Sequence, residues 1–302
     1  MTERPVVSVV VPCLNRAHFL QPTLGSIFQQ SYPHIECIVV DGGSTDGTVN
    51  LLKSYGNRLR WISEPDRGHA DAINKGWQMS RGDIVTWLNA DDCWVAPEAV
   101  HQAVEYLQAH RDVDVVYGES VWIDEHSKII RPGYWKPWDL AFALEWCNHC
   151  IPQPAAFMRR QIMERVGWLD TSFISKKDHE LWLRIGLVGT IHHVPIPWAQ
   201  ERACPGYLAK RGDITAAACV ALTEKFFRLP HVPPLLMEKK SRALSAAYLR
   251  GAWYAAKDGG HYGLALSSIL KGLKLHPGNV RLILHYMRCQ ITKRLRINPR
   301  PC

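Results

Sequence analysis

The 302-residue sequence has no uninterrupted apolar run as long as the roughly 18 residues that a membrane-spanning helix needs. Its beginning, MTERPVVSVVVPCLN, lacks the long apolar region and the small-residue cleavage site of a signal peptide. Apolar residues make up 47% of the chain and charged residues 21%, which excludes a disordered protein. We therefore expect a folded protein of the cytoplasm, with one large core and a smaller second unit.

The nine cysteines show no framework spacing, and their odd number argues against a fully disulfide-paired secreted scaffold. Cys147 and Cys150 flank His149 with the spacing of a zinc knuckle. A zinc site needs two further ligands, and the sequence has no second CxxC pair to supply them. Buried thiols are the preferred interpretation.

The chain also lacks the common nucleotide and nucleic-acid signatures. No GxGxxG follows the first strand-like run, which disfavours a dinucleotide-binding domain, and no GxxxxGK[ST] loop is present. Helix-turn-helix, zinc-finger and RNA-binding strand signatures are absent, so nucleic acid is not an expected partner.

Strand and helix signals alternate through the first 120 residues. Continuous β-branched runs such as VVSVVVP predict strands that are buried on both faces. The alternation predicts an α/β fold, a mainly parallel, Rossmann-like sheet flanked by helices. From about residue 212, apolar periodic stretches punctuated by Gly and Pro predict an all-helical extension. We expect a catalytic-type domain at 1–211 and a helical region with a basic tail at 212–302.

Polar, acidic or glycine-rich residues follow each predicted strand, in PCLN, VVDGGSTDGT, SEPDRG and LNADD. Strand carboxyl ends converge on one crevice in an open α/β sheet. Asp91 and Asp92 either start the next helix or hold a divalent metal there. Asp41 precedes two glycines, a pattern that turn chemistry alone also explains. A site built from acids and a divalent metal, without a glycine-rich phosphate loop, suits the binding of a nucleotide diphosphate.

Taken in order, VSVVVPCLN, VVDGGSTDGT, EPDRGHADAINKG and GDIVTWLNADD resemble the successive motifs of family 2 glycosyltransferases with the GT-A fold. The resemblance continues through YGESVWIDEHSKIIRP, CIPQPAAFMRR and VGWLDTSFISKKDHELWLRI, and covers about the first 210 residues. It implies transfer of a sugar, with a hexose expected first, from a nucleotide-diphosphate sugar to a glycan or lipid-linked acceptor. It also implies inversion at the sugar, dependence on Mg²⁺ or Mn²⁺, and a role in polysaccharide or glycolipid assembly for the cell envelope.

The resemblance also assigns the donor site. Asp41 matches the acid that hydrogen-bonds the base, and NADD matches the DxD-type motif that contacts the ribose and the metal diphosphate. Because Asn89 replaces the first acid of that motif, Asp91 and Asp92 are the expected metal-side residues, in preference to helix capping. The residues that the resemblance places around the donor are Pro12, Asn15, Asp41, Asp66, Asp71, Asn74, Lys75, Asn89, Asp91 and Arg202.

The segment KKDHELW resembles the family's catalytic-base motif. Asp178 matches the acid that takes the acceptor proton, and Glu180 is the alternative base. Two departures are visible: Lys177 stands where a second acid is common, and Cys204 stands where a histidine near the metal is expected, two residues after Arg202. A thiolate at Cys204 could still bind a metal, although thiolates prefer softer ions than Mg²⁺, so the Cys204 departure leaves the completeness of the metal shell open.

The acceptor side and the tail are less specific. Trp94, Trp135 and Gln153 are weak candidates for acceptor contacts, because core packing explains most tryptophans. The last predicted helix is apolar and basic, and ends in KRLRINPRPC. It either packs on the protein with its basic face in water or contacts the inner face of a membrane peripherally.

Two other function classes remain open. A metal-dependent nucleotidyltransferase would need a Gly-rich, basic loop after the first strand, which PCLNRAHFL does not provide. A non-catalytic nucleotide-sugar binding protein would have lost its chemistry, and Lys177 and Cys204 are the only hints of that. The four acids Asp41, Asp91, Asp92 and Asp178 argue against it.

Overall fold

The computed structural model describes residues 4–133, 135–146, 151–203 and 211–284. The chain divides into two compact units. The first comprises Met1–Trp138, Cys150–Ser172 and Arg184–Cys204, and the second Asp139–His149, Phe173–Leu183 and Pro205–Cys302. The predictions made for Cys147, Cys150, Cys204 and the basic tail concern residues outside the described ranges.

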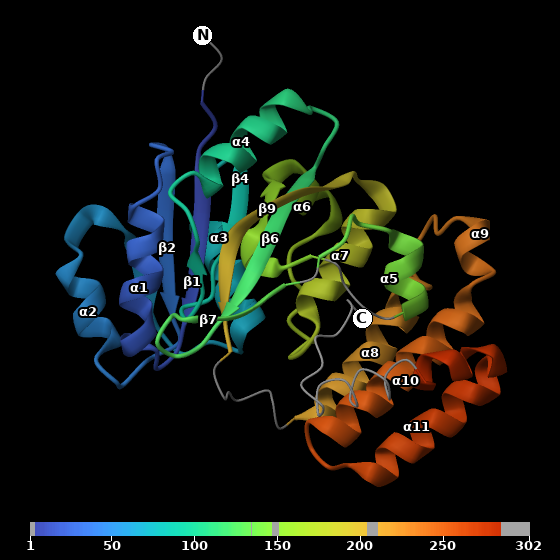
Figure 1. Cartoon of the computed structure of the whole chain (residues 1–302). Helices are drawn as coiled ribbons and strands as arrows, with labels where there is room; N and C mark the ends of the chain where they lie inside the picture. Colours follow the sequence, from blue (N-terminus) through green and yellow to red (C-terminus); the bar gives the residue numbers. More distant parts are fainter. Residues whose placement is uncertain (1–3, 134, 147–150, 204–210, 285–302) are drawn as a thin grey trace. The chain divides into compact units, whose positions relative to one another are not determined.

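The described part of the first unit is built on a nine-stranded sheet with the order β3-β2-β1-β4-β8-β6-β9-β5, and β7 pairs with β6 (Figure 1). The strands are β1 (Val7–Cys13), β2 (Ile35–Asp41), β3 (Arg60–Ser63), β4 (Ile84–Trp87), β5 (Cys93–Trp94), β6 (Val115–Ile123), β7 (Ile129–Pro132), β8 (Ala156–Arg159) and β9 (Ile191–Arg202). Strands β3, β2, β1 and β4 are parallel, as is the β6–β9 pair. The predicted α/β class is confirmed; β8, β7 and β5 add antiparallel pairings that periodicity alone did not reveal.

Helices cover both faces of the parallel strands, as a sheet buried on both sides requires. Strand β1 is buried along its whole length. Val9 packs in one core cluster with Leu24 and Val100, whereas Val10 faces the other side, where a Cβ at Gly76 would lie only 2.4 Å from it. The helices of this unit are α1 (Ala17–Phe28), α2 (Thr48–Ser54), α3 (His69–Met79), α4 (Ala99–Ala109) and α6 (Arg160–Val166), with short 3-10 turns at Gly56–Arg58 and Gln153–Ala155.

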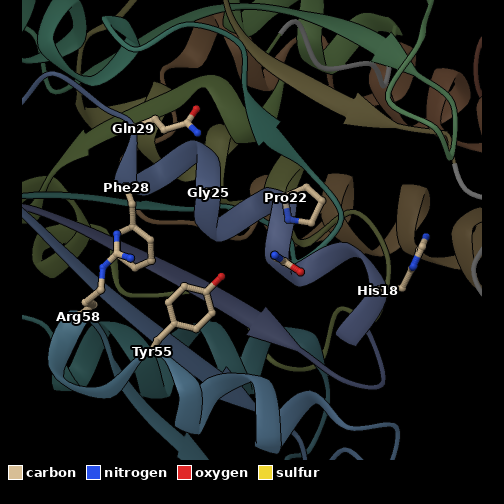
Figure 2. A pocket seen from close by; sticks show the side chains of 8 residues that line it. His18, Pro22, Gly25, Phe28, Gln29, Tyr55 and Arg58 are labelled. Carbon is tan, nitrogen blue, oxygen red and sulfur yellow. The ribbon is translucent and has the colours of Figure 1, made fainter.

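A groove of about 680 Å³ lies between α1 and the turn that follows α2. Figure 2 shows Phe28, Tyr55 and Arg58 at one end of it and His18 at the other. The Arg58 guanidinium lies 4.3 Å from the centre of the Phe28 ring. The residues that line this groove include no acid and none of the predicted site residues, so it is separate from the site described below.

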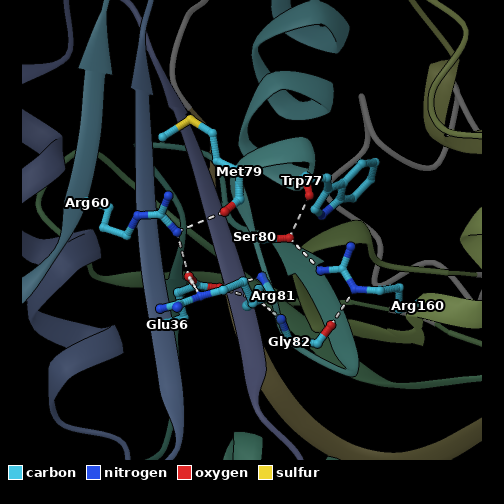
Figure 3. A network of polar contacts seen from close by, with 9 residues as sticks. Glu36, Arg60, Trp77, Met79, Ser80, Arg81, Gly82 and Arg160 are labelled. Atoms are coloured by element: carbon cyan, nitrogen blue, oxygen red, sulfur yellow. Dashed lines mark hydrogen bonds and ion pairs between the residues drawn. The ribbon is translucent and has the colours of Figure 1, made fainter.

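A polar network ties the other end of the sheet together (Figure 3). The carboxylate of Glu36, in β2, accepts hydrogen bonds from the Ser8 hydroxyl at 2.7 Å, from Arg60 at 2.8 Å and from the main-chain N–H of Arg81 at 2.9 Å. Burial alone would raise the pKa of Glu36, but these hydrogen bonds together hold it below its usual value. This end of β2 lies away from the strand carboxyl ends, so the network serves the fold.

The second unit is helical in its described residues, which confirms the predicted helical C-terminal region. Its helices are α5 (Leu140–Trp146), the first part of α7 (Lys177–Val188), α8 (Gly212–Phe226), α9 (Pro234–Met237), α10 (Lys240–Lys257) and α11 (Tyr262–Leu275), with a 3-10 turn at Pro277–Asn279. Helix α10 packs closely on α8, because a Cβ at Gly251 would lie 3.0 Å from the main-chain oxygen of Ala216. Among the helices described here, none combines the length and the apolarity that crossing a membrane requires.

Candidate functional site

Asp41 lies at the carboxyl end of β2, beside the end of β1, and is fully buried. Its carboxylate accepts hydrogen bonds from the main-chain N–H groups of Gly43 at 3.2 Å and Ser44 at 3.0 Å, and from the Ser63 hydroxyl at 2.6 Å. The Ser44 hydroxyl also donates to it. Neither serine was predicted from the sequence. Ser44 lies within a motif that the resemblance covers, so it could have been found there. Ser63 contacts Asp41 only because the β2–β3 register places the two residues side by side.

The loop after β1 is joined to the loop after β2. Asn15 has a φ of 52°, a left-handed conformation that Asn tolerates better than most residues. Its main-chain N–H donates to the Ser44 hydroxyl at 2.7 Å, and its side-chain oxygen accepts from Thr45 at 2.9 Å. Asp46, which the sequence analysis passed over, accepts a hydrogen bond from the first N–H of α1, that of Ala17, at 3.0 Å. These three hydrogen bonds hold the loops as one surface next to Pro12, the buried penultimate residue of β1.

Asp66 is placed directly against this surface. A Cβ at Gly42 would lie 2.6 Å from Oδ2 of Asp66, so the carboxylate touches the backbone that follows Asp41. The other carboxylate oxygen accepts a hydrogen bond from Gly68 at 2.8 Å, which shapes the EPDRG loop. The structure thus brings Asp41, Gly42 and Asp66 together at the ends of two neighbouring strands.

Three predicted donor residues on α3 are engaged within the protein. Lys75 lies 2.8 Å from Glu64 and 3.6 Å from Asp71, which braces the EPDRG loop against the helix. The hydrogen bond to Glu64 is the main reason that the pKa of Lys75 is raised. Asn74 makes a two-way hydrogen bond with the main chain of Leu169, at 2.8 and 3.1 Å. In the structure, these residues, which the resemblance placed around the donor, hold α3, the EPDRG loop and the main chain at Leu169 together.

The adjacent acids Asp91 and Asp92 point in different directions. Asp92 is 5% exposed, and its carboxylate accepts hydrogen bonds from the main-chain N–H of Arg202 at 2.9 Å and from the Asn89 amide at 2.8 Å. The Asp91 side chain is 25% exposed, with the Arg16 guanidinium 4.0 Å away. Burial raises the pKa of Asp91 against the opposing effect of two arginines. Burial, reinforced by two neighbouring acids, raises the pKa of Asp92 well above its usual range.

Arg202 fixes the loop that carries Asp91 and Asp92, which we call the acid loop. Its guanidinium, on a residue that is 7% exposed, donates to the main-chain oxygens of Asp91 at 2.9 Å, Asp124 at 2.6 Å and Glu125 at 3.1 Å, and to the Ser127 hydroxyl at 3.0 Å. These contacts join the end of β9 to the acid loop and to the β6–β7 hairpin. The resemblance placed Arg202 around the donor, and in the structure its guanidinium makes these four contacts within the protein.

The acid loop suits a hard divalent cation. Carboxylate oxygen is the ligand type that Mg²⁺ and Mn²⁺ prefer, and Asp91 offers one carboxylate facing outward. Both oxygens of Asp92 already accept hydrogen bonds. Across the described residues, no group of three or more His, Cys, Asp or Glu side chains could hold an ion by itself. The residues therefore fit a cation that takes few protein ligands and completes its shell from substrate phosphates and water.

The predicted base and its alternative lie in the second unit, in the first turn of α7. Glu180 is 2% exposed and forms an ion pair with Lys225 at 2.7 Å, so it braces α7 against α8. Asp178 is partly exposed. Burial lowers the pKa of its neighbour Lys177, against the opposing charge of Asp178. Of the two acids, Asp178 is the better candidate for a base.

The weak acceptor candidates are engaged inside the first unit. Trp94 is 4% exposed and stacks on Phe157 with ring centres 5.6 Å apart. The indole of Trp135 donates to the main-chain oxygen of Ser120 at 3.0 Å. Gln153 is 9% exposed, and its amide donates to a main-chain oxygen of β4 at 2.6 Å. Core packing therefore explains the presence of Trp94.

In an open α/β sheet, ligands bind in the crevice outside the carboxyl ends of the strands, and Asp41, Asp66 and Asp91 gather at those ends. The sequence model described as "Glycosyl transferase family 2" matches residues 8–167, more than half of the chain. The chain belongs to this family, and the predicted family is confirmed.

Two relatives and two solved structures show the extent of the similarity. An uncharacterised glycosyltransferase of Mycobacterium tuberculosis is 34% identical over 190 residues, 62% of this chain and 71% of the relative. One from Rickettsia felis is 27% identical over 198 residues, 62% of this chain but 32% of the relative, so this alignment spans about a third of that protein.

The solved structures share the fold. The mannosyltransferase PcManGT from Pyrobaculum calidifontis, in complex with GDP-Man and Mn²⁺, has a TM-score of 0.64 at 22% identity over 95% of this chain and 83% of that one. Staphylococcus aureus TarS 1-349, in complex with UDP-GlcNAc, has a TM-score of 0.67 at 15% identity over 96% of this chain and 92% of that one.

Proposed function

We propose that this protein is an inverting, metal-dependent glycosyltransferase that moves a sugar, a hexose in the first instance, from a nucleotide diphosphate to a hydroxyl of a glycan or lipid-linked acceptor. The observation that carries the proposal is the gathering of Asp41, Asp66 and the Asp91 loop at strand carboxyl ends in a family 2 chain. Solved structures of the same fold are in complex with GDP-Man and with UDP-GlcNAc, which supports this donor class. We place the reaction in the cytoplasm, in the assembly of envelope polysaccharide or glycolipid.

The nucleotide base is proposed to lie against Asp41 and Asp66, with Pro12 and Asn15 at the edge of its pocket. A carboxylate accepts from the ring N–H groups of uracil or guanine and so orients the base. Gly43, Ser44 and Ser63 hold Asp41 in one position before the donor arrives. Pre-organisation of this kind improves affinity by removing the need to order the pocket on binding.

The diphosphate is proposed to lie over the Asp91 loop. Asp91 would hold Mg²⁺ or Mn²⁺, which when bound neutralises the charge of the departing nucleotide diphosphate. Arg16 adds a fixed positive charge 4.0 Å from Asp91. Asp92, Asn89 and Arg202 hold the loop from the protein side, so Asp92 acts on the metal site through the position of Asp91.

Asp178 is proposed as the general base. As the acceptor oxygen forms its bond to the anomeric carbon, the bond from that carbon to the diphosphate oxygen breaks, and the acceptor proton passes to the carboxylate of Asp178. A single displacement from the face opposite the leaving group inverts the anomeric configuration. Glu180, buried against Lys225, is proposed to hold the base helix in place.

A donor panel tests the proposal. UDP-, GDP- and dTDP-sugars are incubated with the full chain and Mn²⁺, and release of nucleotide diphosphate is measured for the wild type, for Asp91→Asn and for the exposed control Asp112→Asn. We expect release from one donor, dependent on metal, lost in Asp91→Asn and retained in the control. Neither release nor calorimetric binding of any donor would overturn the proposal, and tight binding without transfer to any acceptor would favour the binding-protein alternative.

A further inference from the structure

The buried residues of helix α11 are small, and several of its large apolar residues are exposed. Its buried residues are Ala265, Ser268 and Gly272, which lie on one side of the helix. This side packs on α10, because a Cβ at Gly272 would lie 3.0 Å from the main-chain oxygen of Ser245 and 3.1 Å from Leu249. Close approach of the two helices explains why the inner face is made of small side chains.

Three large apolar side chains of α11 face the solvent, whereas Ile269 packs partly against the core of this unit. Tyr262 is 73% exposed, Leu266 60% and Leu270 62%, and their spacing of four residues aligns them along the helix as one stripe. We call these three residues the α11 stripe. A helix of a water-soluble unit normally turns such residues inward and its polar ones outward. At the three stripe positions α11 has the reverse arrangement, so this part of its outer face is suited to an apolar environment.

The sequence around the stripe carries charge of one sign. No Asp or Glu occurs in the 44 residues after Asp258, which include eight Lys and Arg. The whole chain has 36 basic and 28 acidic residues, so this segment holds its entire formal charge of +8. Lys274, exposed on the last turn of α11, and Arg281, exposed just beyond it, lie in the described part of that segment.

We propose that the α11 stripe docks on the surface of an anionic lipid bilayer. The three apolar side chains enter the boundary between headgroups and acyl chains, while Lys274 and Arg281 attract anionic headgroups. A symmetric contact with a second copy would set the acid-free segment of one chain against its own surface, and like charges would oppose it. The bilayer supplies both an apolar phase and the opposite charge. This docking surface does not depend on the transfer reaction proposed above.

Vesicle co-sedimentation of the full chain tests the docking surface. We expect the wild type to sediment with vesicles of phosphatidylcholine and phosphatidylglycerol, and much less with phosphatidylcholine alone or at high salt. The double variant Leu266→Gln/Leu270→Gln should partition at least about tenfold more weakly, because two leucines no longer enter the apolar phase. The matched control is Leu235→Gln, on α9, which is equally apolar and 69% exposed, and which should bind as the wild type does.

The charge requirement is tested separately. Lys274→Gln/Arg281→Gln should weaken binding to anionic vesicles and reduce its salt dependence. Unchanged binding by the leucine double variant, or no binding of the wild type to anionic vesicles, would overturn the proposal. Loss of a wild-type dimer in the leucine variant, seen by light scattering without any vesicle binding, would assign the stripe to a second copy instead. Donor hydrolysis in solution should be the same in all these variants, so failure here is distinct from failure of the proposed reaction.

Discussion

The Nε of Arg202 donates a hydrogen bond to the main-chain oxygen of Asp91 at 2.9 Å, although the two residues lie 111 positions apart in the sequence. The same guanidinium holds the β6–β7 hairpin through Asp124 and Ser127. Arg202 is therefore a positioning residue for the acid loop. Its effect on a bound metal or diphosphate would pass through the position of Asp91.

Arg202→Lys should lower stability and metal affinity together. Lysine cannot reproduce the planar fork, so buried carbonyl oxygens lose their partners, and we expect the free energy of unfolding to fall by about 2–3 kcal/mol. The metal concentration for half-maximal turnover should rise about tenfold or more. Denaturant unfolding and a Mn²⁺ titration of turnover measure both, with the exposed Arg228→Lys as the control. A raised donor KM with unchanged stability would instead indicate direct contact with the diphosphate.

Gly42→Ala should weaken donor binding with a small change in stability. The added methyl would lie 2.6 Å from the Asp66 carboxylate, which must move away from Asp41. We expect about a tenfold loss of nucleotide affinity by calorimetry, the equivalent of about 1.4 kcal/mol. Gly25→Ala, in α1, is the matched control: nothing lies within 4 Å of its new methyl, and the helix should gain up to about 1 kcal/mol. Equal donor affinity in the two variants would remove Asp66 from the site.

Asp91→Asn should lower metal affinity, whereas Asp92→Asn should lower stability. Asp91 faces outward, so its variant should keep its melting temperature and lose at least about tenfold in Mn²⁺ affinity, measured by paramagnetic resonance with nucleotide diphosphate present. In Asp92→Asn, the new side-chain NH₂ group would face either the main-chain N–H of Arg202 or the Asn89 amide. Two hydrogen-bond donors would then face each other with no acceptor between them. We expect a loss of about 1–3 kcal/mol in the free energy of unfolding. Equal loss of metal affinity with unchanged stability in both variants would make Asp92 a direct ligand.

Asp178→Asn should separate chemistry from binding. Removing the base should lower the transfer rate by about 10²–10⁴-fold and leave donor affinity unchanged. Glu180→Gln removes the charge partner of Lys225 and should lower the melting temperature, with a smaller effect on rate. Transfer assays, donor calorimetry and thermal unfolding distinguish the two. Should Glu180→Gln alone abolish transfer in a stably folded protein, the roles of the two acids would be exchanged.

Glu36 should make stability depend on pH. Its pKa in the folded chain lies below the ordinary value of 4.5, so the unfolded chain takes up the proton first as the pH falls. Its contribution is then fully present above about 4.5 and is lost as the pH drops through the folded-state pKa. We expect Glu36→Gln to lower the free energy of unfolding by about 1–2 kcal/mol at pH 7, a difference that shrinks in acid. The exposed Glu164→Gln is the control, and a difference that stays constant with pH would contradict this account.

Residues 1–120 allowed the fold class and the site's location to be predicted from the chain alone. Buried β-branched runs separated by helical periods specify parallel strands, and the polar segments that follow them must meet at one edge of the sheet. Asp41, Asp66 and Asp91 follow strands in this way. The antiparallel strands β5, β7 and β8 were not predicted. Strand β5 spans only two residues, and β7 and β8 lie beyond the alternating strand and helix signals of residues 1–120 from which the strands were predicted.

The sequence by itself determined which residue types follow each strand, and hence the kind of ligand that the crevice suits. Only the tertiary structure decided what each side chain contacts. Asp92 and Arg202 lie 110 positions apart and meet through the pairing of β5 with β9, which turns one of two adjacent acids inward and leaves the other outward. In the same way, only the packing of α11 on α10 decided that its small residues are buried while Leu266 and Leu270 are exposed. Spacing along a chain sets the direction of a side chain within its own element, whereas its partners depend on strand register and helix packing between distant segments.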